Sequence, residues 1–377
     1  MPHRTLMIMG TRPEAIKMAP LVRLFRETTD IEPIVCFTGQ HRELLEQVAN
    51  YFDLKADIDL NLMRPNQSLN GLMARCIEGL DHAVEKYHPE SVTAQGDTTT
   101  VAASAIVAFH RRLPFIHVEA GLRTGNLQSP WPEEFNRRLT SIATAVHCAP
   151  TSLAAQNLLQ EGYAESSVSV TGNTVIDALL YTQSKEKSRS EEWYQKYPFL
   201  RGRRMVLITG HRRENHGETF RGLCEAIREL AEKFPDTAFV YPVHPNPHVQ
   251  ETTSHLLSNT PNIYLIEPAA YPEFVWLMDR SYIIITDSGG VQEEAPTLGE
   301  PVLVTRDTTE RPEAVTAGAA KLIGTSPPVL LREATLLLSS EVEYQNRQVQ
   351  ANPYGDGQAS TRILNLIRDL EHKRIAA

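Results

Sequence analysis

The fold of this chain is decided by residues 282–304, which read YIIITDSGGVQEEAPTLGEPVLV. An apolar run at 282–286 is followed by Asp287, by the turn 288–290 and, after a helical stretch, by a second apolar run at 301–304. A strand, a helix and a second strand in this order form a parallel pair joined by a crossover helix. The segment therefore predicts a parallel sheet of the α/β class.

The same alternation runs along the rest of the chain. Short apolar segments alternate with helix-length amphipathic stretches, and further predicted strands lie at 5–9, 33–37, 91–94, 115–118, 146–149, 168–170, 205–209, 239–242 and 263–266. Alternation of this kind predicts parallel sheets with helices on both faces. We expect an α/β protein with two Rossmann-like, doubly wound domains that face each other across a cleft. Open sheets bind ligands at the carboxyl ends of their strands, so the loops there are the candidate site.

A polar, charged stretch at 182–204 interrupts the strand rhythm and is the predicted linker region. It separates a domain at 1–181 from a domain at 205–358. We expect the last helix, within 359–377, to pack back onto the first domain.

Composition excludes several classes of protein. The net charge of −9 argues against a general nucleic-acid binder, because such binders need clustered Lys and Arg. No apolar run approaches the roughly 18 residues needed to span a bilayer. The start MPHRTLMIMG has no leader pattern, and the four cysteines are scattered without a C-x-x-C pair. We expect a cytoplasmic protein with reduced thiols, no membrane partner and no metal site.

The first half carries charged side chains directly after its predicted strands. In GTRPEAIK, Thr11 and Glu14 have the spacing of a capping box, and Arg12 with Lys17 adds two cations at a helix N-terminus, a combination that favours an anion site. Asp97 follows the strand 91–94. The alternative for each is an ordinary helix start.

HVEAGLRTGNLQSPWPEEFNRR, residues 117–138, is the richest loop of this half. Glu119 follows a buried strand, Glu133 opens a helix, and Arg137 lies one turn further along it. Two or three carboxylates converging on one cleft (Asp97, Glu119 and Glu133) provide what proton abstraction and return require.

The second half carries a candidate diphosphate site. Ser288, Gly289 and Gly290 present backbone N–H groups at a helix start, and Glu294 one turn later is placed to bind ribose hydroxyls. Arg311 and His211 each lie in a loop after a predicted strand and are candidate phosphate contacts. No G-x-G-x-x-G follows the first strand and no P-loop motif occurs, which disfavours dinucleotide redox chemistry and P-loop hydrolysis.

These motifs carry a resemblance to a known family. In this order and spacing, GTRPEAIKMAPL, QGDTTT, HVEAGLRTG, SPWPEEFNR, GHRREN, YPVHPNP, TDSGGVQEEAP, RDTTERPEA and NPYGDG resemble the non-hydrolysing UDP-N-acetylglucosamine 2-epimerases of bacteria. The match runs over nearly the whole chain.

The resemblance implies a glycosyltransferase-B-like pair of domains, usually a homodimer, that converts UDP-GlcNAc to UDP-ManNAc for surface polysaccharides without NAD or a metal. It implies removal of the proton at sugar carbon 2, anti elimination of UDP to a 2-acetamidoglucal, and re-addition. By resemblance, Asp97, Glu119, Glu133 and His211 are the catalytic residues. The substrate-binding positions are then Arg12, Lys17, Arg137, Phe274 (uracil), Ser288, Gly289, Gly290, Glu294 and Arg311.

Some members of this family bind a second UDP-GlcNAc as an activator. The matching positions here, in addition to Glu133, are Gln40, Glu43, Asn66, Arg212 and His244. The family pattern with that behaviour has Gln where Glu43 stands and Arg where Asn66 stands. A lost cation and an added anion beside a diphosphate predict weak or no activation by substrate.

Four other functions stay open at this point. A hydrolysing epimerase would release free ManNAc and UDP, and a related 2-epimerase would act on a diacetamido sugar nucleotide. A UDP-sugar-binding protein without turnover is an alternative of a different class, which retention of three carboxylates disfavours. A retaining glycosyltransferase is the fourth.

Overall fold

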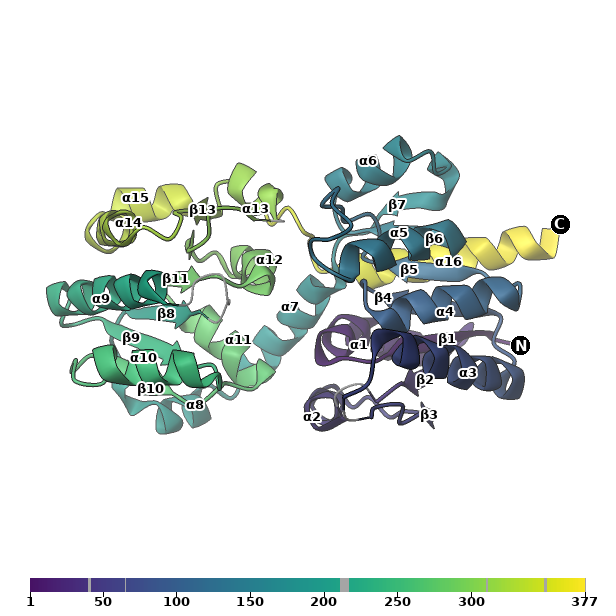
Figure 1. The fold of residues 1–377 in the computed structure, drawn as a ribbon, viewed down its shortest axis with the longest axis horizontal. Helices are drawn as coiled ribbons and strands as arrows, with labels where there is room; N and C mark the ends of the chain where they lie inside the picture. The colour runs from purple at the N-terminus through teal and green to yellow at the C-terminus, as the bar shows by residue number, and fades with distance from the viewer. Residues whose placement is uncertain (40–41, 65, 211–216, 310, 349–350, 377) are drawn as a thin grey trace. The chain divides into compact units, whose positions relative to one another are not determined.

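The structure is a computed structural model of the 377-residue chain. It describes residues 1–39, 42–64, 66–210, 217–309, 311–348 and 351–376, the side chains of 42–44 and 373–376 excepted. The chain divides into two compact units, residues 1–178 with 355–377, and residues 179–354. Each unit is an α/β layer structure built on its own sheet (Figure 1).

The first unit is built on a parallel sheet in the strand order β3-β2-β1-β4-β5-β6-β7, as far as the described residues show. Its strands are β1 (His3–Met9), β2 (Ile31–Phe37), β3 (Ile58–Asp59), β4 (Ser91–Gln95), β5 (Phe115–Val118), β6 (Thr144–Ala149) and β7 (Val168–Val170). Its helices are α1 (Arg12–Arg26), α2 (Arg42–Phe52), α3 (Leu69–Tyr87), α4 (Thr99–His110), α5 (Glu133–Ala143), α6 (Ser152–Gln160), the start of α7 (Thr174–Lys187) and α16 (Ala359–Ala376).

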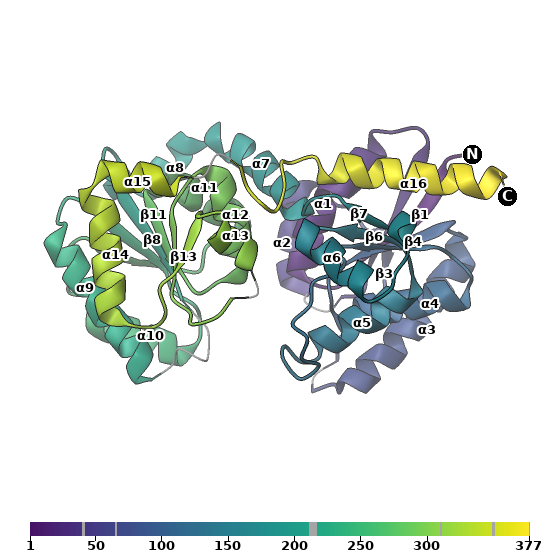
Figure 2. The ribbon, with the colours of Figure 1, turned by 90° about the horizontal axis from the view of Figure 1, so that it is seen from above.

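Helices cover both faces of this sheet. α1 packs against α2 and α16 on one face, and α4 packs between α3 and α5 on the other (Figure 2). β1 and β4 are central, and their residues are almost all fully buried because the sheet is covered on both sides. Even the polar residues Ser91, Thr93 and Gln95 of β4 are buried for this reason.

α16 joins the first unit although it ends the described chain. Ile363 and Ile367 are fully buried, and Asp177 accepts hydrogen bonds from the backbone N–H groups of Ala359 (3.2 Å) and Ser360 (2.8 Å). Arg368 pairs with Asp30 at 2.6 Å. The first unit is therefore assembled from two separate segments of the chain.

The second unit repeats the design. In the described residues its parallel sheet has the order β10-β9-β8-β11-β12-β13. The strands are β8 (Met205–Thr209), β9 (Ala238–Pro242), β10 (Ile263–Ile266), β11 (Ile283–Thr286), β12 (Val302–Val304) and β13 (Ala320–Leu322). The helices are the end of α7, α8 (Ser190–Lys196), α9 (Glu218–Lys233), α10 (Pro247–Leu257), α11 (Tyr271–Arg280), α12 (Gly289–Leu298), α13 (Pro312–Thr316), α14 (Pro327–Ser339) and α15 (Glu341–Arg347).

Residues 182–204, which the sequence suggests as a linker, are largely helical and belong to the second unit. The rings of Trp193 and Tyr197 stack on Trp276 of α11, with centroids 6.1 Å and 6.4 Å away. These aromatic contacts anchor a segment whose charged surface made it resemble a linker.

The predicted α/β class with parallel sheets in both halves is confirmed. Two strands, β3 and β13, are absent from the prediction; they read ID and AKL, too short and too polar to stand out as apolar runs. Within the described part of the chain, no helix combines the length and the apolar character that crossing a bilayer requires.

Candidate active site

The site in the first unit begins where β1 and β4 lie side by side. β1 continues through α1 to β2 on one side, and β4 continues through α4 to β5 on the other. The loops after the two strands therefore part at their carboxyl ends, which is the switch point where open α/β sheets bind ligands. Thr11 and Asp97 lie in these loops, and Glu119 follows the next strand, β5.

Glu119 is held at this edge by two side chains from other elements. Its Oε2 lies 2.5 Å from Lys17 Nζ and accepts a hydrogen bond from Gln95 Nε2 at 2.8 Å. Its backbone φ is +65°, a left-handed conformation that is uncommon outside glycine and concentrates at functional sites. The structure thus brings together two of the predicted site residues, Lys17 and Glu119.

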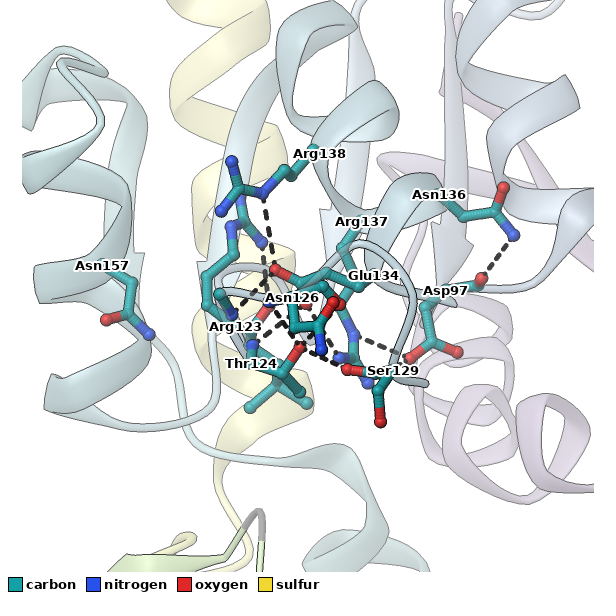
Figure 3. A network of polar contacts seen from close by, with 12 residues as sticks. Asp97, Arg123, Thr124, Asn126, Ser129, Glu134, Asn136, Arg137, Arg138 and Asn157 are labelled. Carbon is teal, nitrogen blue, oxygen red and sulfur yellow. Dashed lines mark hydrogen bonds and ion pairs between the residues drawn. The ribbon is translucent and has the colours of Figure 1, made fainter. Parts of the chain in front are cut away.

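Asp97 is held by α5 (Figure 3). Both Nη2 (2.7 Å) and Nε (2.9 Å) of Arg137 contact Oδ2 of Asp97, and Asn136 Nδ2 donates to the Asp97 carbonyl oxygen at 2.9 Å. The Asp97 side chain keeps 26% of its surface exposed. Two further predicted site residues, Asp97 and Arg137, are therefore in contact, and the Asp97 carboxylate stays accessible.

The two neighbouring acids at the start of α5 have different surroundings. Glu134 is fully buried, accepts backbone hydrogen bonds from Thr124 (3.0 Å) and Gly125 (3.3 Å), and pairs with Arg137 at 3.2 Å. Glu133 instead has a buried Oε2 without a hydrogen-bond partner among the described residues. An unsatisfied buried acceptor costs about 1–3 kcal/mol, and Glu133 is therefore a candidate for a ligand contact.

Several other residues lie at this edge of the sheet, although the sequence did not identify them as site residues. Glu14 ties two site loops together, and burial raises its pKa to about 7. His117 Nε2 lies 2.8 Å from the Gly96 carbonyl oxygen, and burial lowers its pKa to about 4, so a neutral ring donates this bond. For Glu14, the sequence offered one indication of its position, the capping-box spacing from Thr11. For Gln95 and Asn136 the sequence offered no such indication, because amide side chains are common in all kinds of local structure.

The second unit has its own switch point, between β8 and β11. β11 ends at Thr286, and Ser288 is the N-cap of α12, which begins at Gly289 and Gly290. The Ser288 N–H donates to Thr286 Oγ1 at 2.9 Å. The predicted Ser-Gly-Gly turn is therefore a helix N-terminus at a ligand-binding edge, where N–H groups and the helix dipole favour an anion.

The other predicted residues of this unit lie on α11 to α13. Glu294 is buried in α12 and accepts a hydrogen bond from Tyr271 Oη at 3.0 Å. Phe274 is half-buried on α11, which packs on α12. Arg311, the N-cap of α13, pairs with Glu293 through Nε.

The remaining predicted positions are scattered or lie outside the described residues. Arg12 is half-buried at the start of α1, Asn66 is exposed with φ +53°, and His244 is exposed and accepts the Asn246 N–H at 3.2 Å. The residues that fall outside are His211, Gln40, Arg212 and the side chain of Glu43.

Comparison with known proteins identifies relatives over nearly the full length. The family model for UDP-N-acetylglucosamine 2-epimerase matches residues 23–368. The UDP-N-acetylglucosamine 2-epimerase of Escherichia coli (strain K12) is 50% identical over 371 residues, covering 97% of this chain and 98% of the relative.

Two solved structures show the fold relationship. The crystal structure of UDP-GlcNAc 2-epimerase from Neisseria meningitidis bound to UDP-GlcNAc has a TM-score of 0.90 and 48% identity, covering 97% of this chain and 100% of that one. A structure of Acinetobacter baumannii MurG, 14% identical, has a TM-score of 0.60 over 98% of this chain and 100% of that one. The second likeness is one of fold alone, and it confirms the predicted glycosyltransferase-B-like class. With a family model that spans most of its length and a relative half identical to it, this chain belongs to the UDP-N-acetylglucosamine 2-epimerase family.

Proposed function

We propose that this protein interconverts UDP-GlcNAc and UDP-ManNAc at sugar carbon 2 without net hydrolysis. The supporting observation is the pair of carboxylates Asp97 and Glu119, each held by a cation from another element at one switch point. The 48% identical Neisseria meningitidis protein, whose structure holds UDP-GlcNAc, supports the choice of substrate.

The proposed reaction balances as an elimination followed by its reversal on the other face. A carboxylate takes the carbon-2 proton, the C1–O bond to the diphosphate breaks, and its electron pair leaves with UDP. The sugar becomes a 2-acetamidoglucal. Protonation of carbon 2 from the opposite face and return of the UDP oxygen to carbon 1 give the epimer.

Asp97, Glu119 and Glu133 are the proposed proton carriers. General acid–base catalysis needs one group to take the proton and a second group on the other face to return one. The contacts of Arg137 with Asp97 and of Lys17 with Glu119 suit this work, because they fix each carboxylate before the substrate arrives. His211 is proposed to assist them.

The departing diphosphate needs a site that stabilises developing negative charge. The N–H groups of Ser288, Gly289 and Gly290 at the start of α12 suit this role. Arg311 is proposed to contact the phosphates, Glu294 the ribose and Phe274 the uracil. Arg12, Lys17 and Arg137 are proposed to hold the sugar or phosphates from the first unit.

We further propose that the protein acts as a homodimer whose product supplies bacterial surface polysaccharide synthesis. The reaction as written consumes no redox cofactor and requires no metal. It also predicts that every turnover exchanges one hydrogen with solvent, and this makes the reaction testable.

The test is an NMR time course of the purified protein with UDP-GlcNAc in deuterated water and no added cofactor. We expect UDP-ManNAc to accumulate, with deuterium at carbon 2 of both epimers. Free ManNAc as the main product would replace the proposal by the hydrolysing reaction. Protium retained at carbon 2 in the product would exclude proton abstraction.

A further inference from the structure

Glu14 is a buried carboxylate that connects two loops of the site. Its side chain belongs to α1, and the residue is only 2% exposed. Its Oε2 accepts hydrogen bonds from the backbone N–H groups of Gly10 (2.5 Å) and Thr11 (3.0 Å). Its Oε1 accepts a hydrogen bond from the hydroxyl of Thr98, 84 residues further along the chain, at 2.7 Å.

Thr98, which donates this hydrogen bond to Glu14, is the direct neighbour of Asp97 in the sequence. It is the N-cap of α4, and its Oγ1 accepts the Val101 N–H at 3.3 Å while its hydroxyl donates to Glu14. Asp97 precedes Thr98 directly, and Arg12 follows Thr11 directly. One carboxylate thus contacts the loops on both sides of the β1–β4 switch point, through two backbone N–H groups on one side and the Thr98 hydroxyl on the other.

The bond to Thr98 goes beyond what starting a helix requires. A capping box needs only the reciprocal bonds between Thr11 and Glu14, which are present. Burying the carboxylate completely costs free energy, and the raised pKa of Glu14, about 7, reflects that cost. A structural cap at the protein surface would avoid it.

We propose that Glu14 is a positioning residue that acts through Thr98 on Asp97 and through the Gly10–Thr11 backbone on Arg12. With its side chain buried, it does not touch substrate. The proposal rests on the proposed acid–base function of Asp97. Asn136 and His117 hold the same loop at the Asp97 and Gly96 carbonyl oxygens, so Glu14 supplies one of several restraints.

The first test compares Thr98→Val with Thr98→Ser. Valine removes the hydroxyl that bonds to Glu14 and caps α4, whereas serine keeps both bonds. We expect kcat to fall on the order of 10- to 100-fold in Thr98→Val with KM changed less than threefold, because small misplacement of a reacting group has effects of this size. Thr98→Ser should restore kcat to within about threefold of the wild type.

Thr151→Val is the matched control. Thr151 is a buried N-cap threonine of α6 in the same unit, and its Oγ1 accepts the Ala154 N–H at 3.1 Å. Losing either cap costs about 1 kcal/mol of stability. We expect Thr151→Val to keep the wild-type kcat. A lower kcat in Thr98→Val alone would then result from a misplaced Asp97 and not from a general loss of stability.

Glu14 itself is tested by Glu14→Gln and Glu14→Ala. The glutamine amide oxygen accepts from Gly10 and Thr11 while its NH₂ donates to Thr98, so kcat should stay within about fivefold of the wild type. Alanine breaks all three bonds and should lower kcat at least as much as Thr98→Val. If Glu14→Ala does not fold, the Thr98 pair decides.

Hydrogen exchange of the amides of residues 96–101 gives a readout independent of turnover. Faster exchange is expected in Thr98→Val and Glu14→Ala but not in Thr98→Ser or Thr151→Val. If wild-type protein shows no epimerisation, the proposed function fails and exchange alone decides whether Glu14 restrains the loop. Wild-type kcat and exchange in Thr98→Val, with an active wild type, would overturn the positioning role.

Discussion

At the scale of single residues, Asp97 and Glu119 share a pattern of support. Each follows a buried strand, and each has one oxygen held by a basic side chain from a helix: Oδ2 of Asp97 by Arg137 and Oε2 of Glu119 by Lys17. A carboxylate fixed in this way keeps its orientation without losing its ability to accept a proton. Their amide variants keep the shape and lose that ability.

We therefore expect Asp97→Asn and Glu119→Gln each to lower kcat on the order of 10²-fold or more, while UDP binding stays within a few-fold. The measurements are steady-state turnover of UDP-GlcNAc and calorimetric titration with UDP. Asp30→Asn is the control, because Asp30 is a carboxylate of the same unit paired with Arg368. Near-normal turnover in either site variant would remove that residue from the proton transfer.

The sequence predicted the positions of single site residues but not their contacts with residues far away in the chain. Sequence order alone placed Asp97 and Glu119 at strand ends, because strand ends are visible as the limits of apolar runs. It could not separate Glu133 from Glu134, since the backbone partners that distinguish Glu134 lie nine and ten residues earlier, at Gly125 and Thr124. Nor could it show that Glu14 reaches Thr98, a contact between residues far apart in sequence.

At the scale of elements, strands that form a short apolar run were predictable at the centre and at the edge of a sheet, and the strands β3 and β13 were not. β5, β7, β8 and β10 have the predicted bounds, because each is a short apolar run between turn residues. The edge strands β3 and β13 pair on one side only, and their few residues are at most partly apolar. Such strands form because a neighbour offers hydrogen bonds, which a local pattern does not encode.

The loop after β5 depends on a glycine for a reason that the structure makes specific. Gly121 has φ +89°, and a Cβ there would lie 2.2 Å from the Ala154 carbonyl oxygen and 2.9 Å from Leu158 Cδ1, both on α6. Gly162 has the same φ, but a Cβ there would meet nothing within 4 Å. An alanine at Gly162 would suffer backbone strain alone, whereas an alanine at Gly121 would suffer backbone strain and a steric clash.

We expect Gly162→Ala to lose about 1–2 kcal/mol of stability from backbone strain alone. Gly121→Ala should lose that amount and about 1–3 kcal/mol more, because helix backbone cannot move aside as a flexible side chain does. Thermal unfolding midpoints of both variants are the measurement, with Gly121→Ala lower by several degrees. Equal midpoints would show that the β5 loop and α6 separate at little cost.

At the scale of the whole molecule, the surface of α4 and α5 carries exposed apolar side chains. Phe109 at the end of α4 is 65% exposed, and Phe135 and Ile142 on α5 are 51% and 74% exposed. The two helices that carry these residues pack side by side in the first unit. Exposed apolar patches of this kind mark interaction surfaces. We propose this face for the homodimer.

The wild-type protein should sediment as a dimer, and the double variant Phe109→Gln with Ile142→Gln should dissociate at least about 10²-fold more readily, because each buried apolar side chain contributes about 1.5–3 kcal/mol. Sedimentation velocity over a concentration series measures this. Val342→Gln is the control, an equally exposed apolar residue (67%) on α15 of the second unit. A double variant that dimerises like the control would place the interface elsewhere.

The two-segment construction of the first unit affects how the chain is made. A ribosome that has synthesised residues 1–354 has supplied all of the second unit but not the helix that covers α1 of the first. Until residues 359–367 are synthesised, the face of α1 that packs on α16 is exposed to water. Asp177 also lacks its hydrogen bonds from the backbone N–H groups of Ala359 and Ser360 until then. The unit that begins first in the sequence is thus the unit that is completed last, and the nascent polypeptide contains all of the second unit before it contains all of the first.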